Sequence, residues 1–220
     1  MISLNLTDPV LVFWWYIPII IGGLIAGSGF IASFFPEKTE GKTLGVLGMK
    51  GAGKSQFLSN LGLFEFEDRA TNISDYNAHT LTFGDRTVEI QQGQDVGGDV
   101  DIAGFYNEWV GIKDITVFIF DGGRFINNKE YQSNVKARLF AIDKIARKKF
   151  GEGSDFKNIV VIVSHADLYK QGKEEDRKEL LEKVANIIQD KSYFALLKKN
   201  CYAADLRNES EVKAIAEKIF

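Results

Sequence analysis

The segment from Leu44 to Ser55 reads Leu-Gly-Val-Leu-Gly-Met-Lys-Gly-Ala-Gly-Lys-Ser and carries the strongest structural signal in the chain. Its first four residues are mainly apolar and predict a buried strand. The next eight residues match the complete G-x-x-x-x-G-K-[ST] pattern, and a helix is expected from about residue 54 to residue 63. A strand, this loop and a helix in succession are typical of a phosphate-binding loop.

The residue types in this loop suit a nucleoside triphosphate. Glycines let the backbone wrap around a phosphate with its N–H groups turned inward, and the start of the helix adds partial positive charge. We expect Lys54 to reach the β- and γ-phosphates and the Ser55 hydroxyl to bind Mg²⁺. The residues expected to contact the nucleotide here are Gly48, Met49, Lys50, Gly51, Ala52, Gly53, Lys54, Ser55 and Gln56.

Strands and helices alternate along the rest of the chain. Two segments, 115–120 and 159–164, are nearly continuous apolar runs, as expected for parallel strands covered on both faces. Further strands are expected at 79–83, 87–91 and 200–203, and helices at 100–110, 131–150, 174–189 and 210–219. We therefore predict an α/β protein of the P-loop NTPase class, a three-layer sandwich with a mostly parallel six-stranded sheet.

The N-terminal segment predicts a membrane anchor. Residues 9–35 contain no charged side chain, and a bilayer core of roughly 30 Å needs about 20 apolar helical residues. The spanning helix is expected over residues 17–35, with an aromatic cluster at 13–16 at the membrane interface. A cleaved signal peptide is a poorer interpretation, because residues 1–8 lack Lys and Arg. A buried core helix is the other alternative.

The flanking charges predict how the anchor is oriented. Lys38 and Lys42 follow the span and no basic residue precedes it, so the positive-inside rule puts the following domain in the cytoplasm. We expect residues 1–36 to form the transmembrane anchor, 37–42 a linker and 43–220 a globular domain, giving a single-pass membrane protein. The net charge of −3 gives no reason to expect nucleic acid, and the single cysteine, Cys201, cannot form an internal disulfide.

A second motif, Asp95-Val96-Gly97-Gly98, follows a strand expected to end near Gln92. With this motif, residues 43–220 resemble a Ras/Arf-type small GTPase domain in length, element order and motif order, and the motif is especially similar to the Arf branch. The resemblance implies that Asp95 holds Mg²⁺ through water and that the Gly98 N–H contacts the γ-phosphate. It implies GTP and GDP, with Mg²⁺, as the ligands.

The resemblance also implies a base-recognition motif. Where the family has Asn-Lys-x-Asp, this chain has Ser164-His165-Ala166-Asp167. The family's aspartate accepts guanine N1–H and N2–H, donors that adenine lacks, so Asp167 is expected to select guanine. Ser164 stands in place of the asparagine and His165 in place of the lysine whose stem covers the base. Ala203 and Ala204 lie where a family loop contacts guanine O6.

Two further positions bear on hydrolysis. The first switch, expected at residues 68–78, needs a Thr or Ser that closes on Mg²⁺ and the γ-phosphate; Thr71 and Ser74 both suit, and we favour Thr71. Asp99 occupies the position where the family has a glutamine that orients the attacking water. It lacks an amide and adds negative charge near the γ-phosphate, so slow hydrolysis is expected. The catalytic group would comprise Asp99, Lys54 and Thr71, and the metal ligands Ser55, Thr71 and Asp95.

Three functions remain open on these residues. The first is a slow GTPase switch on the cytoplasmic face of a membrane, similar in architecture to the β subunit of the signal recognition particle receptor. The second is a non-hydrolysing, GTP-bound docking module that recruits a partner to the membrane. The third is an ATP-binding P-loop protein, which Asp167 disfavours. The expected partners are the bilayer, a protein effector or membrane protein, and an exchange factor or activating protein.

Overall fold

The computed structural model describes residues 41–63, 73–84, 86–96, 106, 109–151, 156–189 and 191–220, with 73–75, 94–96 and 199 described by their backbone only. The chain divides into two units, Met1–Thr39 and Glu40–Phe220, and all described residues belong to the second. The expected membrane segment at 9–35 and most of the expected helix at 100–110 lie outside the described residues. Within the ranges just given, no helix is both long and apolar enough to cross a bilayer.

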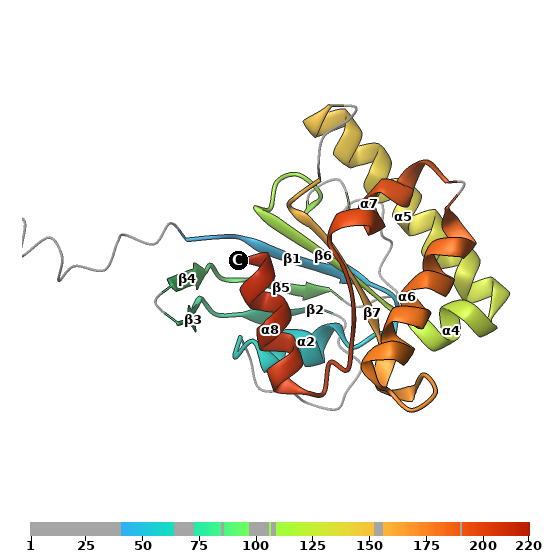
Figure 1. Ribbon diagram of the computed structural model, residues 1–220. Helices are drawn as coiled ribbons and strands as arrows, with labels where there is room; N and C mark the ends of the chain where they lie inside the picture. The colour runs from blue at the N-terminus through green and yellow to red at the C-terminus, as the bar shows by residue number, and fades with distance from the viewer. Residues whose placement is uncertain are drawn as a thin grey trace, which may run out of the picture. The chain divides into compact units, whose positions relative to one another are not determined.

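A four-stranded parallel sheet forms the centre of the domain (Figure 1). Its order is β1 (Leu44–Gly48), β6 (Ile115–Asp121), β7 (Ile159–Ser164) and β8 (Cys201–Ala204). Every residue of β1 and β7 is buried, whereas β8 at the edge is half-buried. The continuous apolar runs of the sequence are explained by this burial, because both faces of the inner strands are covered.

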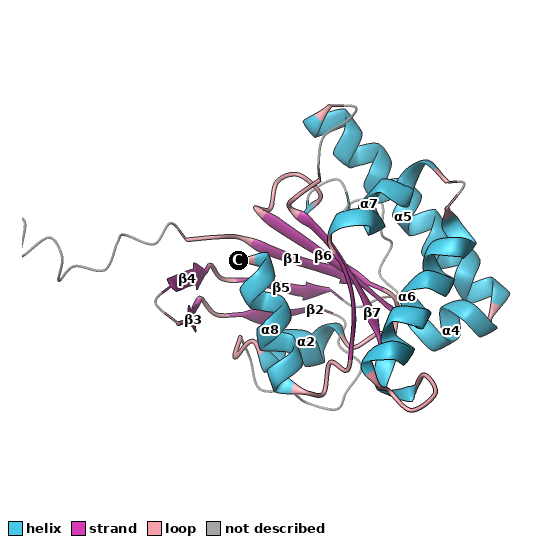
Figure 2. Ribbon diagram, in the orientation of Figure 1, coloured by secondary structure: helices cyan, strands magenta, loops and turns pink. Residues whose placement is uncertain are grey.

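Helices cover both faces of this sheet, which gives the expected three layers. Figure 2 shows α2 and α8 together on one side and α4, α5, α6 and α7 on the other. The longest helix, α5, turns one apolar row inward through Val135, Leu139 and Ile142. The helix bounds are α2 (Lys54–Asn60), α4 (Gly122–Asn127), α5 (Lys129–Phe150), α6 (Glu174–Ile188), α7 (Ala195–Lys199) and α8 (Glu209–Ile219), with 3₁₀ turns η1 (Ala166–Leu168) and η2 (Ser192–Phe194).

Four short strands form one interrupted antiparallel hairpin. They are β2 (Ile73–Tyr76), β3 (His79–Phe83), β4 (Arg86–Ile90) and β5 (Gly93–Val96). Tyr76 pairs with Gly93 and His79 pairs with Ile90, so β2–β5 and β3–β4 share a single register. A parallel bridge from Lys42 to Ile90 attaches this hairpin to the chain just before β1.

The predicted α/β fold with a mostly parallel sheet is confirmed, but the sheet has four strands and not six, since β3 and β4 form a separate antiparallel pair. The reason lies between β1 and β5, where the Tyr76 hydroxyl donates a 2.8 Å hydrogen bond to the Leu44 carbonyl. That carbonyl lies on the edge of β1 that faces the hairpin, and a side chain satisfies it instead of a strand N–H. Gly93 makes room for this arrangement, because a Cβ there would lie 2.3 Å from the Tyr76 hydroxyl oxygen.

Most of the expected elements agree with the structure to within two residues, but three details differ. Helix α2 ends at Asn60 and not near residue 63, because a turn with Gly62 at a φ of 77° follows it. Asp95 lies inside β5 and not after a strand end, since the hairpin resumes its pairing at Gly93. The short helices α4 and α7 and the strand β2 were not predicted from the sequence.

Replacing Tyr76 with Phe tests the hairpin attachment. The ring is only 3% exposed, so losing the hydroxyl leaves the Leu44 carbonyl buried without its donor. We expect the free energy of unfolding to fall by about 1–3 kcal/mol in urea denaturation. Tyr202→Phe, which removes a hydroxyl from a half-buried ring on β8, is the control and should cost much less. Equal losses in the two variants would contradict this account.

Candidate functional site

The register of the parallel sheet brings the predicted motifs to one edge. Gly48 pairs with Ile119, and Ser164 pairs with both Asp121 and Ala204. The loops after β1, β6, β7 and β8 therefore all leave from the carboxyl edge of the sheet. Ligands of open α/β sheets bind outside this edge.

The loop that follows β1 turns tightly against β6. The Met49 N–H donates to the Ile119 carbonyl at 3.0 Å, and a Cβ at Gly48 would lie 2.2 Å from the same oxygen. Gly51 and Gly53 have φ values of 68° and 88°, a left-handed conformation that is strained for residues with a side chain. The glycines of the motif are thus required by this backbone path, independently of any ligand.

The lysine of this loop is buried. Lys54 is 7% exposed, and its Nζ donates to the Met49 carbonyl at 3.2 Å, so the ammonium lies against its own loop. A buried ammonium is stable only with polar or anionic partners. The position of this charge, beside a glycine-rich backbone, fits an anion such as a phosphate.

Two arginines that sequence reasoning missed also contact the loop. Arg138 donates to the Gly48 carbonyl at 3.2 Å, and Arg124 donates to the Lys50 carbonyl at 3.4 Å. The Arg124 guanidinium lies 4.4 Å from the centroid of the Tyr131 ring, and its backbone N–H is capped by Asp121 at 2.8 Å. With Lys54, these groups surround the loop with positive charge, which favours an anionic ligand.

The Tyr131 ring packs against the Arg124 guanidinium. Burial raises the pKa of Tyr131 to about 12, so the hydroxyl stays protonated in neutral solution. Its oxygen accepts the Asp121 N–H at 2.9 Å. The end of β6 and the first turn of α4 are therefore held in place beside the loop.

The predicted base motif begins with two residues that contact β6. Ser164 is 1% exposed, and its hydroxyl donates to the Phe120 carbonyl at 3.2 Å and lies 3.1 Å from His165 Nδ1. His165 has a φ of 57°, and its Nδ1 is 3.5 Å from Asp121 Oδ2. The Ser164 hydroxyl is thus used within the strands, whereas His165 and Asp121 lie at the carboxyl edge.

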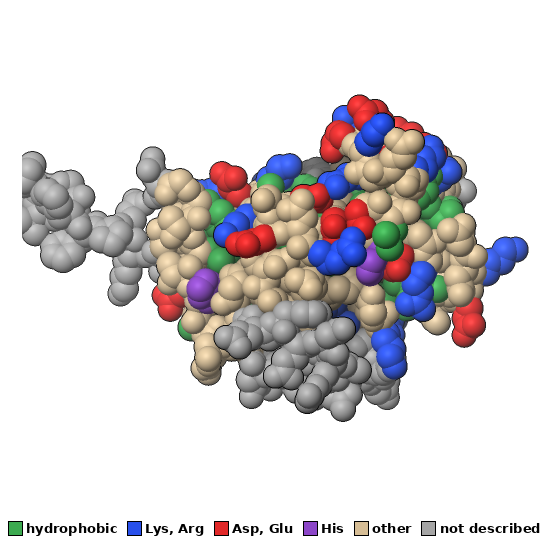
Figure 3. Space-filling model, turned by 90° about the horizontal axis from the view of Figure 1, so that it is seen from below, with side chains coloured by type: hydrophobic (Ala, Val, Ile, Leu, Met, Phe, Trp, Pro, Cys, Tyr) green, Lys and Arg blue, Asp and Glu red, His purple; other side chains and the backbone are tan. Residues whose placement is uncertain are grey.

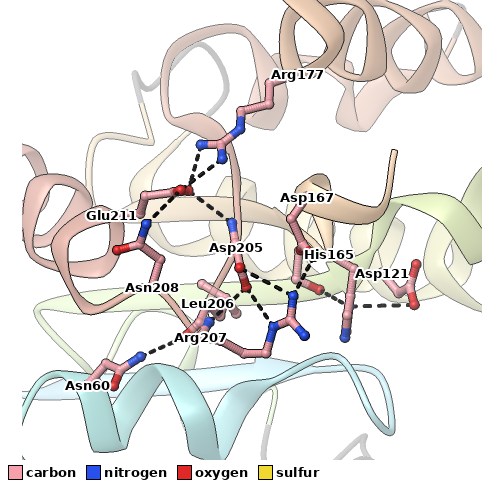
Figure 4. A network of polar contacts seen from close by, with 11 residues as sticks. Asn60, Asp121, His165, Asp167, Arg177, Asp205, Leu206, Arg207, Asn208 and Glu211 are labelled. Atoms are coloured by element: carbon pink, nitrogen blue, oxygen red, sulfur yellow. Dashed lines mark hydrogen bonds and ion pairs between the residues drawn. The ribbon is translucent and has the colours of Figure 1, made fainter. Parts of the chain in front are cut away.

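Asp167 in η1 is paired with Arg207, a residue that sequence reasoning also missed (Figure 4). Arg207 Nη2 contacts Asp167 Oδ2, and Arg207 Nε donates to Asp205 Oδ1 at 3.1 Å. Partial burial alone would raise the pKa of Asp205, but hydrogen bonds from Arg207 outweigh it and lower that pKa. Asp167 Oδ1 is buried and has no hydrogen-bond partner.

The loop that carries Arg207 is held at its base by Glu211. This carboxylate accepts two hydrogen bonds from Arg177, at 2.6 and 2.8 Å, and one from the Asp205 N–H at 3.0 Å. Figure 4 shows Asn208 reaching the same carboxylate, at 3.2 Å. Such bidentate arginine–carboxylate pairs combine strength with defined geometry, so the path of the loop after β8 is well determined.

Leu206 joins this loop to α2 and to the loop that precedes α2. Asn60 of α2 donates to the Leu206 carbonyl at 2.6 Å. The Leu206 side chain lies 3.1 Å from where a Cβ at Gly53 would stand. The loop after β8 therefore packs against both ends of α2.

The structure brings together many of the residues predicted from the sequence. Gly48 to Gln56, Ser164, His165, Asp167, Ala203 and Ala204 all lie at the carboxyl edge, on β1, β7, β8 or the loops and helix turns that follow them. Thr71, Gly98 and Asp99 lie outside the described residues. Asp95 is described by its backbone, which pairs with Ser74.

Of the three predicted magnesium ligands, only Ser55 has a described side chain. Ser55 lies in the first turn of α2, directly after Lys54, and is partly exposed, which suits a ligand shared by metal and phosphate. Across the described part of the chain, no group of three His, Cys, Asp or Glu side chains could hold a metal ion. A cation here would need oxygens from the nucleotide or from residues outside that part.

Two site residues that were not predicted, Asp121 and Arg207, differ in whether the sequence contains a signal for them. Asp121 ends an apolar strand, and polar residues at the carboxyl ends of parallel strands are candidates for a site. Arg207 has no such signal, because its partner Asp167 is 40 residues away in the chain.

No family model and no curated protein sequence matches this chain.

Seen from below in Figure 3, Lys and Arg side chains lie beside Asp and Glu side chains on the described surface. The positive charge of Lys54, Arg124 and Arg138 is concentrated on the loop after β1. The carboxylates of Asp121, Asp167 and Asp205 follow β6, β7 and β8. The edge thus combines a cationic loop with a neighbouring acidic group, an arrangement that suits a ligand with an anionic end and a donor-rich end.

Proposed function

We propose that this chain is a membrane-anchored GTP-binding protein that acts as a slow GTPase switch on the cytoplasmic face. The observation that carries the proposal is the complete glycine-lysine-serine loop at the carboxyl end of β1, with the Lys54 ammonium buried against it. Buried positive charge beside inward-facing backbone N–H groups is the chemistry that holds a triphosphate.

The phosphates would bind along residues 48–56. Lys54 would contact the β- and γ-oxygens, and the Ser55 hydroxyl would share a Mg²⁺ ion with them. Arg124 and Arg138 support this assignment, since they add positive charge beside the loop. Thr71 and Asp95 would complete the metal shell, and the Gly98 N–H would contact the γ-phosphate.

The base would bind beside Asp167. Guanine offers N1–H and N2–H, and a carboxylate can accept both, whereas adenine offers neither donor there. The buried, unpartnered Oδ1 of Asp167 supports a donor-bearing ligand, because leaving such an atom unsatisfied costs about 1–3 kcal/mol. Ala203, Ala204 and His165 would surround the base, with Leu206 between base and phosphates.

Turnover would be slow because of Asp99. A carboxylate cannot donate an amide hydrogen bond to the attacking water, and it repels the charge that builds up on the γ-phosphate. Lys54 and Thr71 would then be the remaining groups that stabilise the transition state. An activating protein, an exchange factor and an effector are the partners that a switch of this kind requires.

Replacing Lys54 with Met tests the phosphate assignment. The full-length protein with Mg²⁺ should bind GTP and GDP in clear preference to ATP and ADP, measured by titration calorimetry in detergent. Lys54→Met should weaken GTP about 10- to 100-fold, the usual value of a hydrogen bond to a charged group. Lys148→Met, an exposed change on α5, is the matched control for charge. Equal affinities in the two variants would overturn the phosphate assignment. Native ATP binding as tight as GTP would overturn the guanine assignment.

Replacing Asp99 with Gln tests the slow step. The native protein should hydrolyse GTP no faster than about 10⁻⁴ s⁻¹, the order of magnitude of unassisted small GTPases. Asp99→Gln should raise the single-turnover rate and leave GTP affinity nearly unchanged, because the loss lies in the transition state. Rapid hydrolysis by the native protein that disappears in Asp99→Ala would show instead that Asp99 is the catalytic group.

The membrane anchor is tested by fractionation. The protein should stay with membranes through high-salt and carbonate washes, because a spanning helix is not removed by charge screening. Deleting residues 1–36 should release the remaining domain into the soluble fraction. A truncated protein that still sediments with membranes, without aggregating, would place the anchor elsewhere.

A further inference from the structure

Arg207 occupies the carboxylate to which the proposed function assigns the guanine base. Its Nη2 contacts Asp167 Oδ2, and the same guanidinium holds Asp205 through Nε at 3.1 Å and Nη2 at 3.4 Å. In Figure 4 the guanidinium lies between the two carboxylates, which come from the loops after β7 and β8. One side chain thus bridges the two segments expected to surround the base.

The other carboxylate oxygen of Asp167, Oδ1, has no hydrogen-bond partner. Oδ1 is buried and accepts no hydrogen bond, so the carboxylate is satisfied on one side only. Guanine would present two donors to the two oxygens of one carboxylate, N1–H and N2–H. Oδ1 can accept a donor only once the atoms that bury it move, and Oδ2 can accept one only if Arg207 moves or shares it.

We propose that Arg207 competes with guanine for Asp167 and thereby lowers the affinity of this site for guanine nucleotides. This inference rests on the proposed function, because it assumes that Asp167 reads the base. The competitor belongs to the chain itself, so it is present at a fixed, high effective concentration. Binding of the base and departure of Arg207 from Asp167 are then two sides of one equilibrium.

Arg207 is able to leave Asp167 without disturbing the loop. Its side chain is 64% exposed, and after release it keeps its contacts with Asp205. Its backbone N–H donates to Asp205 Oδ1 at 3.0 Å, and this bond does not depend on the guanidinium. The Glu211–Arg177 pair holds the base of the loop independently. The competition therefore concerns one exposed guanidinium and not the fold of the segment.

The test measures how Arg207→Gln changes nucleotide affinity. Full-length protein with Mg²⁺ is titrated with guanosine, inosine and adenosine diphosphates. Arg207→Gln should bind guanosine diphosphate roughly two- to fivefold more tightly, since exposed ion pairs are weak competitors. Inosine diphosphate, which lacks the 2-amino donor and needs one oxygen only, should gain less. Adenosine diphosphate should change by less than about twofold, because it makes no bond to Asp167.

Two further variants separate competition from a general effect of charge. Arg86→Gln removes one positive charge from an exposed arginine on β4, which contacts the Glu217 carbonyl, and should leave all three affinities unchanged. Arg207→Lys keeps the charge but cannot bridge both carboxylates, so its gain should be smaller than that of Arg207→Gln. Thermal melting of each variant checks that the fold is retained.

A double-mutant cycle with Asp167→Asn identifies the partner. The asparagine variant should prefer xanthosine diphosphate, whose extra carbonyl pairs with the amide. In that background there is no carboxylate to release, so adding Arg207→Gln should leave xanthosine diphosphate affinity unchanged. A gain that persists in the asparagine background would overturn the proposal that Arg207 acts through Asp167.

The outcomes also distinguish this inference from the proposed function. Guanine preference in the native protein with unchanged or weaker guanosine diphosphate binding in Arg207→Gln would overturn only the role of Arg207. Weaker binding would make Arg207 a support of the base. A native protein that binds adenosine diphosphate as tightly as guanosine diphosphate would overturn the guanine assignment, and with it the inference.

Discussion

The close approach of β1 to β6 at Gly48 is the constraint on which the candidate site depends. A Cβ at this position would lie 2.2 Å from the Ile119 carbonyl, so only glycine lets the two strands keep their register up to the last residue of β1. The Met49 N–H then bonds the same carbonyl, which fixes where the loop leaves the sheet. From that point the loop runs past α4, and Arg124 can reach the Lys50 carbonyl. The tight turn and the cationic surroundings of Lys54 thus have one structural origin.

The loop after β8 links the two halves of the edge. Through Leu206 it contacts Gly53, in the loop where the phosphates are proposed to bind, and Asn60 at the end of α2. Through Arg207 it contacts Asp167. Glu211 and Arg177 keep its base in position by a two-pronged ion pair that is only partly exposed. At the proposed base end, one exposed side chain, Arg207, bridges Asp167 and Asp205. The proposed competition by Arg207 follows from this contact.

Long apolar runs were the most reliable predictors of the fold. The strands at Ile115–Asp121 and Ile159–Ser164 and the helices α5, α6 and α8 agree closely with expectation, because their burial patterns follow from local spacing of apolar residues. The edge of the sheet was not predictable in the same way. There the Tyr76 hydroxyl takes the Leu44 carbonyl and interrupts the pairing, a contact between residues 32 positions apart that leaves no periodic trace. The predicted strand end before Asp95 failed for a related reason, since the hairpin resumes at Gly93.

The candidate site, like the fold, was predictable only where its geometry is set by residues that are close in the sequence. The path of residues 48–55 could be predicted from the sequence, since a strand end, a glycine-rich turn and a helix start follow one another within a few residues. Asp167 could be placed at the end of its strand by the same kind of local order. The environment of that carboxylate depended on three-dimensional packing, because Arg207 reaches it from a loop 40 residues away. Packing likewise brings Arg124 and Arg138 to the carbonyls of Lys50 and Gly48. Local geometry is encoded by neighbouring residues. Ion pairs at the site instead form between loops that are distant in the sequence and lie side by side only because the parallel strands end at the same edge.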